Sequence, residues 1–518
     1  MNTDTLQKST LPAEPNGEPD SFEQSLKLAF EMHNAGRCEE AEALCRVLEK
    51  IQPRNSQLLF LLGMVLHKTG QDEEAVLWLS MAVRHRPDAA RIFNGLGCAC
   101  QGLGDHARAA AAFEKALELQ PESADVFYNL GKSCYRLEQV DRATELFHRA
   151  VEINPHDANS WNNLGKCLKE LNRLDESIAA YGRAVEIMPD YALAHYGRAI
   201  SLMTAGRLLE GFREYEWRWH SMTPRKFPQP AWQGENAPGK TLFVHAEQGS
   251  GDAIQMVRFI GATRERTGCV ILECRPELTT LFQYSKCADV VIPHGAAIPP
   301  FDYFVPLMSL PRVLGITMDT IPARTPYLQA PVHNVLSTAQ PGCLKVGLTW
   351  AGNPNHHQDA ARSIPLQALL PVLQTPGVAF YNLQQTVPPR DQACLQSLAR
   401  VIHSDLMFKD FLDTAAVIAE MDLVISVDTA VAHLAGALAK PVWLLVQHSP
   451  DWRWFLDRAD TPWYPTMQLF RQATRGHWEL PVRRVADALR RLAGSTEIPI
   501  EILRGLQPAS TAHRLAAA

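Results

Sequence analysis

Five prolines in the first two hundred residues recur at a constant interval of 34 residues. They are Pro53, Pro87, Pro121, Pro155 and Pro189. Proline lacks a backbone N–H and its ring clashes with the preceding helical turn, so each proline marks a helix end at the same place in a repeat. This period is typical of helix pairs that bury their apolar faces only against neighbouring pairs. The sequence therefore predicts that the chain begins with an α-solenoid.

Two of the repeats carry matching apolar residues at matching intervals. The shared set is an aromatic residue, a Leu-Gly pair and a second aromatic residue: Phe127, Leu130, Gly131 and Phe147 in one repeat, Trp161, Leu164, Gly165 and Tyr181 in the next. Glycine lets the paired helices approach closely, and the large residues fill the space between them. The pattern resembles tetratricopeptide repeats, of which five copies cover residues 22–190.

A sixth copy begins near residue 192 and ends differently from the others. It keeps Ala199 but continues into Tyr215-Glu216-Trp217-Arg218-Trp219. The terminal repeats of a solenoid need a modified outer face. We therefore expect the array to occupy residues 22–220 and to end in a cap that contacts the next domain.

Asn129 and Asn163 occupy the same position in consecutive repeats. An amide side chain both donates and accepts hydrogen bonds, so a ladder of such groups holds an extended peptide without reading its side chains. The array resembles that of O-linked N-acetylglucosamine transferases, in which asparagines of this surface bind the acceptor. A protein or peptide acceptor is thus one expectation, and a merely solvated polar face is the alternative.

The charge and the hydropathy pattern exclude two classes of partner. The 518 residues include 50 basic and 56 acidic side chains, a net charge of −6, which does not favour binding to nucleic acid. No apolar run is long enough to span a membrane. Eleven scattered cysteines and the lack of a signal sequence favour the cytoplasm. We expect residues 1–21 and 501–518 to be disordered.

The second half of the chain alternates strand and helix patterns. Prolines and a glycine between 221 and 238 indicate a linker. A strand at 241–246, a glycine loop and further strands at 270–274 and 290–293 then predict a small α/β domain over 239–335. A second α/β domain is expected over 343–500, with strands near 345–350, 378–383, 400–403, 422–427 and 441–446.

Four stretches place polar or small residues where strands end or helices start. They contain Gly249, Gly251 and Asp252; Trp350 and Asn353; Arg362; and Asp428, Thr429, Ala430 and His433. Ligands bind at the carboxyl ends of parallel strands, so these stretches are expected to meet in a cleft between the two domains. The helix that follows Thr429 offers unpaired N–H groups to a phosphate, with Asp428 or Thr429 as its cap.

Residues 238–500 resemble glycosyltransferases of the heptosyltransferase type, which have the GT-B fold. The resemblance rests on Gly251-Asp252 and on Asp428-Thr429-Ala430-x-x-His433-Leu434-Ala435. It implies two Rossmann-like domains, Asp252 as the catalytic base, and a sugar-donor diphosphate held by the Asp428 turn. It also implies that Arg362 grips phosphate, where the family commonly has lysine. No Asp-x-Asp pair is present, so we expect a nucleotide sugar as co-substrate with no metal or other cofactor.

Several of these residues have a structural alternative. Asp252 is either the base or an N-cap, and His433 is either a ligand of the sugar donor or a histidine satisfied in the core. Gln384 follows a strand and is a candidate for a hydrogen bond to the sugar donor. The aromatic segment from Asp451 to Gln472 either stacks on a ligand or covers the end of the sheet, and we favour the second role.

Three functions are compatible with this organisation. The first is a glycosyltransferase that moves a sugar to a protein selected by the repeats. The second is a non-catalytic scaffold whose α/β half retains a nucleotide pocket. The third is a carbohydrate-epimerising enzyme, which would release a free sugar and need no acceptor.

Overall fold

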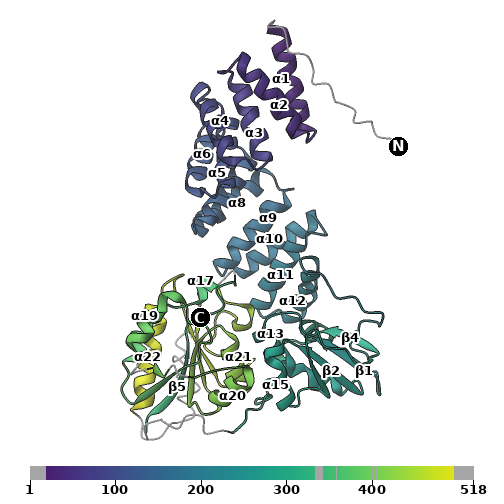
Figure 1. The fold of residues 1–518 in the computed structure, drawn as a ribbon, viewed down its shortest axis with the longest axis vertical. Helices are drawn as coiled ribbons and strands as arrows, with labels where there is room; N and C mark the ends of the chain where they lie inside the picture. The colour runs from purple at the N-terminus through teal and green to yellow at the C-terminus, as the bar shows by residue number, and fades with distance from the viewer. Residues whose placement is uncertain (1–18, 333–341, 357–358, 399–401, 404–405, 495–518) are drawn as a thin grey trace, which may run out of the picture. The chain divides into compact units, whose positions relative to one another are not determined.

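The computed structural model describes residues 19–332, 342–356, 359–398, 402–403 and 406–494 (Figure 1). The chain divides into two compact units between Tyr191 and Ala192. Of the predicted disordered lead 1–21, residues 1–18 lie outside the described residues, whereas 19–21 belong to a helix. The predicted tail 501–518 and the predicted boundary at 335 also lie outside them. Among the described residues, no helix is both long and apolar enough to cross a membrane.

The first unit consists of antiparallel helix pairs, as the repeat pattern predicts. The helices are α1 (Pro19–Asn34), α2 (Cys38–Ile51), α3 (Ser56–Lys68), α4 (Asp72–His85), α5 (Ala90–Gly102), α6 (His106–Leu119), α7 (Ala124–Arg136), α8 (Val140–Ile153), α9 (Ala158–Glu170) and α10 (Leu174–Ile187). Each of the five periodic prolines lies two residues beyond the last residue of an even-numbered helix. The helix ends are therefore confirmed at the predicted positions.

Glycines at one repeat position set the distance between the paired helices. A Cβ atom added to Gly97 would lie 2.4 Å from the Phe113 ring, and one added to Gly131 would lie 2.9 Å from the Phe147 ring. Gly63 and Gly165 meet Leu79 and Tyr181 in the same way. These close approaches explain why the repeat keeps a glycine opposite a large side chain.

The sixth repeat packs within the second unit. It comprises α11 (Ala192–Thr204), α12 (Leu208–Glu214) and the 3-10 helix η1 (Tyr215–His220). Met203, Leu208 and Phe212 are buried in the same apolar cluster as the strands of the first α/β domain. The compact units consequently divide before this repeat, and not at residue 220, where the sequence pattern placed the end of the array.

A four-stranded parallel sheet forms the first α/β domain within the described residues, in the order β3-β2-β1-β4. The strand β4 was not predicted, because it is short and bounded by prolines. The elements are β1 (Thr241–His245), α13 (Ser250–Met256), η2 (Val257–Phe259), α14 (Ile260–Arg264), β2 (Cys269–Cys274), α15 (Pro276–Tyr284), β3 (Val290–Pro293), β4 (Tyr303–Pro306), η3 (Leu307–Ser309), α16 (Leu310–Val313) and η4 (Met318–Thr320).

The second α/β domain contains a six-stranded parallel sheet in the described residues, in the order β10-β9-β8-β5-β6-β7. Its elements are β5 (Leu344–Thr349), α17 (Asp359–Arg362), η5 (Leu366–Leu369), α18 (Leu370–Leu373), β6 (Val378–Asn382), α19 (Pro389–Ser397), β7 (Ile402–His403), α20 (Phe411–Ala419), β8 (Leu423–Val427), α21 (Ala430–Ala437), β9 (Val442–Val446), η6 (Trp452–Trp454), β10 (Met467–Arg471) and α22 (Glu479–Ala493).

Both sheets have the Rossmann-like strand order in which the connections reverse beside the first strand. In the larger sheet this switch point lies between β5 and β8, and Thr349 pairs with Ser426 at their carboxyl ends. One face of this sheet packs against α20 and α21, and the other packs against α18 and α22. The α-solenoid followed by two Rossmann-like domains is thus confirmed, and ligands of such sheets bind at the switch point.

Candidate active site

The loop after β1 leads directly into α13, which carries Asp252 in its first turn. Carboxylate Oδ2 of Asp252 accepts the N–H of Gly249 at 3.0 Å. This bond closes the glycine loop and caps the start of α13, but the N-cap residue is Gly249 and Asp252 is the third residue of the helix, so the N-cap reading of Asp252 was wrong in position. The second oxygen of the carboxylate faces away from this bond and meets the second α/β domain.

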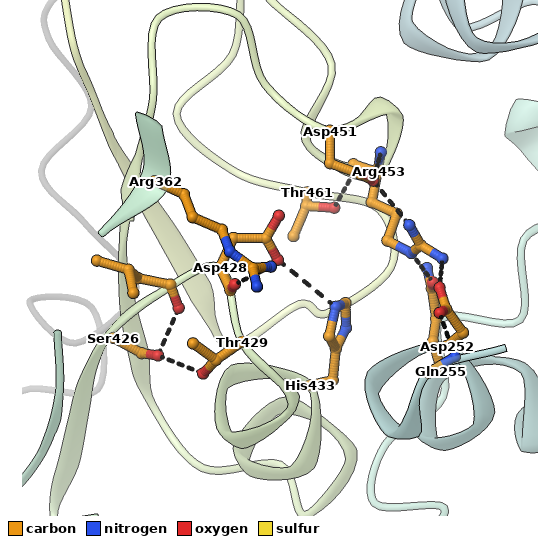
Figure 2. Close-up of polar contacts among 12 residues, drawn as sticks. Asp252, Gln255, Arg362, Ser426, Asp428, Thr429, His433, Asp451, Arg453 and Thr461 are labelled. Carbon is orange, nitrogen blue, oxygen red and sulfur yellow. Dashed lines mark hydrogen bonds and ion pairs between the residues drawn. The ribbon is translucent and has the colours of Figure 1, made fainter. Parts of the chain in front are cut away.

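Arg453 is the partner of that second oxygen, and it lies in η6 of the other α/β domain. Its Nη2 forms an ion pair with Oδ1 of Asp252, its Nη1 donates to Asp451 at 2.8 Å, and its Nε donates to Gln255 (Figure 2). The Arg453 side chain is only 7% exposed. Burial opposes its charge, but the carboxylates of Asp451 and Asp252 outweigh burial and raise the pKa of Arg453. Arg453 therefore links the two domains at Asp252.

The first turns of α13 and α21 face each other at the same place. A Cβ atom added to Gly251 would lie 3.1 Å from Cδ2 of His433 and 3.4 Å from Cα of Ala430. A side chain at position 251 would thus push against the second domain. The sequence predicted that the Gly251-Asp252 loop and the Asp428 turn meet, and in the structure they do.

The turn between β8 and α21 is held by hydroxyl groups and by Arg362. Ser426 Oγ lies 2.5 Å from Thr349 Oγ1 and 3.2 Å from Thr429 Oγ1. Arg362 Nη1 donates to the Asp428 carbonyl at 3.0 Å (Figure 2). Thr429 is the N-cap residue of α21, as one of the two readings predicted, although its side chain makes no capping hydrogen bond. The first N–H groups of this helix have no partner within it, which suits an anionic group.

The Asp428 carboxylate is the most perturbed acid of the site. Burial and the nearby Asp451 carboxylate raise its pKa to about 6, while Arg362 and Arg453 act in the opposite direction. Its side chain nevertheless keeps 18% exposure, so it remains accessible to a small ligand. A carboxylic acid with this pKa changes its protonation state near neutral pH.

His433 is buried against aromatic side chains and also lies close to Asp428. Its Nδ1 lies 2.9 Å from the Tyr464 hydroxyl, its ring stacks on Trp454, and its Nε2 lies 3.8 Å from Asp428. Burial, followed by the charges of the nearby arginines, lowers the pKa of His433 well below its usual value. The core reading of His433 fits these contacts, and its contact with a sugar donor stays a prediction.

Three predicted ligand contacts have other roles or positions. Trp350 is buried and donates its indole N–H to Asp391 at 3.0 Å. Gln384 accepts from the N–H groups of Trp350 and Ala351 and donates to the carbonyls of Ala351 and Thr386. These four bonds occupy its amide, so Gln384 positions the loop after β5. Asn353 is exposed and accepts the N–H of Asn355.

Small residues in the loop after β5 bring Arg362 to the site. A Cβ atom added to Gly352 would lie 2.4 Å from Nη2 of Arg362 and 2.4 Å from a carboxylate oxygen of Asp359. Asp359 in turn accepts Nε of Arg362 at 3.3 Å and the Ser363 hydroxyl at 3.0 Å. The Arg362 side chain is 16% exposed, so it is not sealed from a ligand.

The two predicted peptide-binding asparagines already form hydrogen bonds, Asn129 to the neighbouring repeat and Asn163 within its own helix α9. Asn129 donates its amide to Asn94 at 3.3 Å, and Asn163 donates to the carbonyl of Asn159 at 2.9 Å. An asparagine has two amide hydrogens and a carbonyl, so each side chain keeps further hydrogen-bonding capacity. Peptide binding by this face stays a prediction.

Arg453 and the hydroxyls of Thr349 and Ser426 were missed by the sequence analysis. The segment around Arg453 was read as a cover because of its tryptophans, and Trp452, Trp454 and Trp463 are indeed buried. No pattern links Arg453 to Asp252, which is 201 residues away in the chain. Among the described residues, no cluster of three or more His, Cys, Asp and Glu side chains is suited to hold a metal ion.

Comparisons with known proteins agree with the two halves of the chain. Tetratricopeptide repeat models match residues 34–90, 94–158, 146–179 and 167–206. The model of glycosyltransferase family 9 (heptosyltransferase) matches residues 372–454, which contain the Asp428 turn and Arg453 but not Asp252. The predicted combination of these two families is confirmed.

One curated relative matches more than half of the chain. Protein FlbA of Caulobacter vibrioides is 32% identical over 339 residues, or 59% of this chain and 56% of the relative, so the chain spans about half the length of that protein. Among solved structures, PilF of Pseudomonas aeruginosa is 17% identical, with a TM-score of 0.37 over 41% of this chain and 96% of PilF. A MamA structure from Desulfovibrio magneticus is 17% identical, with a TM-score of 0.31, and the match covers 33% of this chain and 96% of MamA.

Proposed function

Because the chain joins tetratricopeptide repeats to a glycosyltransferase family 9 domain, we propose that it transfers a sugar from a nucleotide-sugar donor to a protein held by the repeats. One observation carries this proposal. The first turn of α13, with Asp252, meets the first turn of α21, with the Asp428 turn, at the carboxyl ends of both sheets. This is the edge at which parallel sheets bind their ligands.

The sugar-donor half of the site is assigned to the second domain. The diphosphate lies at the start of α21, where the helix N–H groups and Arg362 neutralise its charge. The match to family 9 supports this assignment, because it covers the Asp428 turn. Asp428 is an acid of this turn, and its raised pKa makes the protonated form, which tolerates a phosphate, easier to reach than for an ordinary aspartate.

The reaction is a direct displacement at the anomeric carbon. The acceptor hydroxyl oxygen forms the new bond to that carbon, the bond to the diphosphate oxygen breaks, and the hydroxyl proton passes to Asp252. The electron pair of the broken bond leaves with the nucleoside diphosphate, whose charge Arg362 stabilises. No metal is assigned to this step.

Arg453 must change partners for Asp252 to act as a base. A carboxylate paired with an arginine is a weak proton acceptor, because the positive charge stabilises its ionised form. The sugar-donor diphosphate competes for the same guanidinium. Its arrival would draw Arg453 from Asp252 and free the carboxylate in the complex that needs it.

The Asp252 and Arg453 ion pair also favours a second function. If the pair persists when nucleotide is bound, Asp252 only joins the two domains. The chain would then be a scaffold that binds nucleotide without turnover, with the repeats as its partner-binding part. Measured turnover distinguishes the two functions.

The full-length chain is tested with a panel of UDP-, GDP-, ADP- and dTDP-sugars, with and without a protein extract of the source organism. We expect one donor to release nucleoside diphosphate and one protein to gain the mass of one sugar. Asp252→Asn should abolish both. Asp289→Asn is the matched control, because Asp289 also pairs with an arginine and caps a backbone N–H. Nucleotide binding without release by the unaltered chain would favour the scaffold.

A further inference from the structure

The sixth repeat shares its apolar core with both α/β domains. Phe212 of α12 packs edge-to-face on Trp452 of η6, with ring centroids 5.5 Å apart. Met203 and Leu208 belong to the same buried cluster as Ile254 of α13. Residues derived from a repeat thus share one buried core with the helix of Asp252 and pack directly against the 3-10 helix of Arg453.

Two side chains at the end of this repeat hold the loop between β1 and α13. The Tyr215 hydroxyl lies 2.8 Å from Nε2 and 3.1 Å from Oε1 of Gln248. Arg218, only 1% exposed, donates to Glu247 at 2.9 Å and to Ser309 at 2.8 Å. Gln248 and Glu247 directly precede Gly249, whose N–H is bound by Asp252. The loop that orients Asp252 is therefore fixed from the repeat side.

The charge on Glu247 makes Arg218 essential to this arrangement. Burial raises the pKa of Glu247, and Arg218 opposes that effect. A buried carboxylate without a cation is costly, so the loop and Arg218 depend on each other. Tyr215 adds a neutral contact, because burial raises the pKa of its phenol and keeps it protonated.

A third side chain of the repeat, Tyr196 on α11, is partly open to solvent. It is 39% exposed, and its ring lies 5.6 Å from that of Tyr215. Burial raises the pKa of Tyr196, and the carboxylates of Asp451 and Asp252 raise it further. Tyr196 is thus a partly exposed residue beside Tyr215, whose hydroxyl holds the loop that precedes Asp252.

We infer that the sixth repeat is part of the active site: Tyr215 and Arg218 position the Asp252 loop, and Tyr196 contacts the protein acceptor beside Asp252. The role of Tyr196 rests on the proposed transferase function, whereas the positioning role does not. A tyrosine suits the acceptor contact, because it offers a flat apolar ring and a hydroxyl at little entropic cost.

Amide hydrogen exchange tests the positioning role without any substrate. Tyr215→Phe removes one hydroxyl. Arg218→Lys keeps the positive charge but replaces the planar guanidinium, which donates through two nitrogens, by a single amine. We expect exchange at residues 246–252 of the full chain to accelerate roughly fivefold in each variant. Exchange at α3 serves as the internal reference, and Tyr284→Phe, at an exposed tyrosine of α15, is the matched control. Unchanged exchange at 246–252 in both variants would overturn the positioning role.

Kinetics separate positioning from a general loss of structure. With the sugar donor found in the panel, Tyr215→Phe should lower kcat for diphosphate release about tenfold and change KM for that donor less than twofold, because the displaced loop carries the base. A fall that appears only in KM would contradict this role.

The acceptor contact is tested by the ratio of sugar transfer to donor hydrolysis. Tyr196→Ala should lower this ratio at least tenfold, whereas Tyr196→Phe should keep most of it and Tyr284→Ala all of it. An unchanged ratio in Tyr196→Ala would refute the contact. If the panel yields no transfer at all, the proposed function and the acceptor contact both fall, and the exchange experiment alone decides the positioning of Asp252.

Discussion

Arg453 of the second α/β domain forms an ion pair with Asp252 of the first, across 201 residues of sequence. The same guanidinium binds Asp451 and Gln255, so three side chains from two domains share one buried cation. The charges compensate one another only while the two domains stay together. This relationship decides how the site responds to mutation.

Removing the guanidinium should weaken both the fold and the site. Arg453→Ala leaves the carboxylates of Asp252 and Asp451 without their cation, and we expect a loss of about 3 to 5 kcal/mol in unfolding free energy. Urea denaturation measures it. Arg264→Ala is the matched control: its partner is Asp289 and its side chain is 42% exposed, so the loss should stay below about 1 kcal/mol. Equal losses in the two variants would contradict the bridging role of Arg453.

Asp428 should give the stability a distinct pH dependence. Burial raises its pKa from 3.8 to about 6, so the folded state holds a proton that the unfolded state has lost. The contribution of Asp428 to the unfolding free energy therefore falls as pH rises from about 4 to about 6 and stays low above that. Asp428→Asn removes this loss, so its stability relative to the unaltered chain should improve by at most about 3 kcal/mol between pH 4 and pH 7.

The control for this pH dependence has the opposite sign. The hydrogen bond from Arg264 lowers the pKa of Asp289, so the stability that Asp289 contributes is present above its unfolded pKa and lost as pH falls. Asp289→Asn should therefore lose stability relative to the unaltered chain at pH 7 and approach it at low pH. Parallel pH profiles for the Asp428 and Asp289 variants would refute both assignments.

Gly352 controls the position of Arg362. Because a methyl group at this position would lie 2.4 Å from Nη2 of Arg362, Gly352→Ala must displace the guanidinium. Loss of its bond to the Asp428 turn should weaken UDP, GDP or ADP binding about tenfold, which corresponds to about 1.4 kcal/mol. Isothermal titration measures the affinity. Gly261→Ala, where nothing lies within 4 Å of the added carbon, should bind as the unaltered chain does.

The repeats offer a matched pair of glycines. Gly97→Ala would place a methyl group 2.4 Å from the Phe113 ring and should cost about 1 to 3 kcal/mol. Gly182→Ala adds the same group in the middle of α10 where nothing lies within 4 Å, and it should stabilise by up to about 1 kcal/mol. Thermal unfolding of both variants tests the explanation of the repeat glycine. A stabilising Gly97→Ala would refute it.

Much of the fold was predictable because its determinants are local. A proline ends a helix wherever it stands, so the period of 34 residues located α2, α4, α6, α8 and α10. The apolar run at β8 likewise identified a buried strand of a parallel sheet, because that signal too lies in consecutive residues. The strands β4 and β10 escaped prediction, because a short proline-bounded segment and an aromatic run carry no strand periodicity.

The candidate site was predictable only in part. The residues at strand ends, such as Arg362 and Asp428, follow from the rule that ligands bind at the carboxyl ends of parallel strands. The roles of Gln384 and Trp350 did not follow, because a polar group next to a site serves equally well to hold a loop. Both side chains form hydrogen bonds with other groups of the protein.

The sequence by itself determined the repeats, the two α/β domains and the stretches that carry Asp252 and Asp428. Local periodicity, turn residues and helix starts encode these features within a few positions of the chain. Only the tertiary structure decided that Arg453 pairs with Asp252 and that Tyr215 and Arg218 of the sixth repeat hold the same loop. These contacts join residues distant in the chain, and their energy comes from shared burial and charge compensation, which no local pattern records.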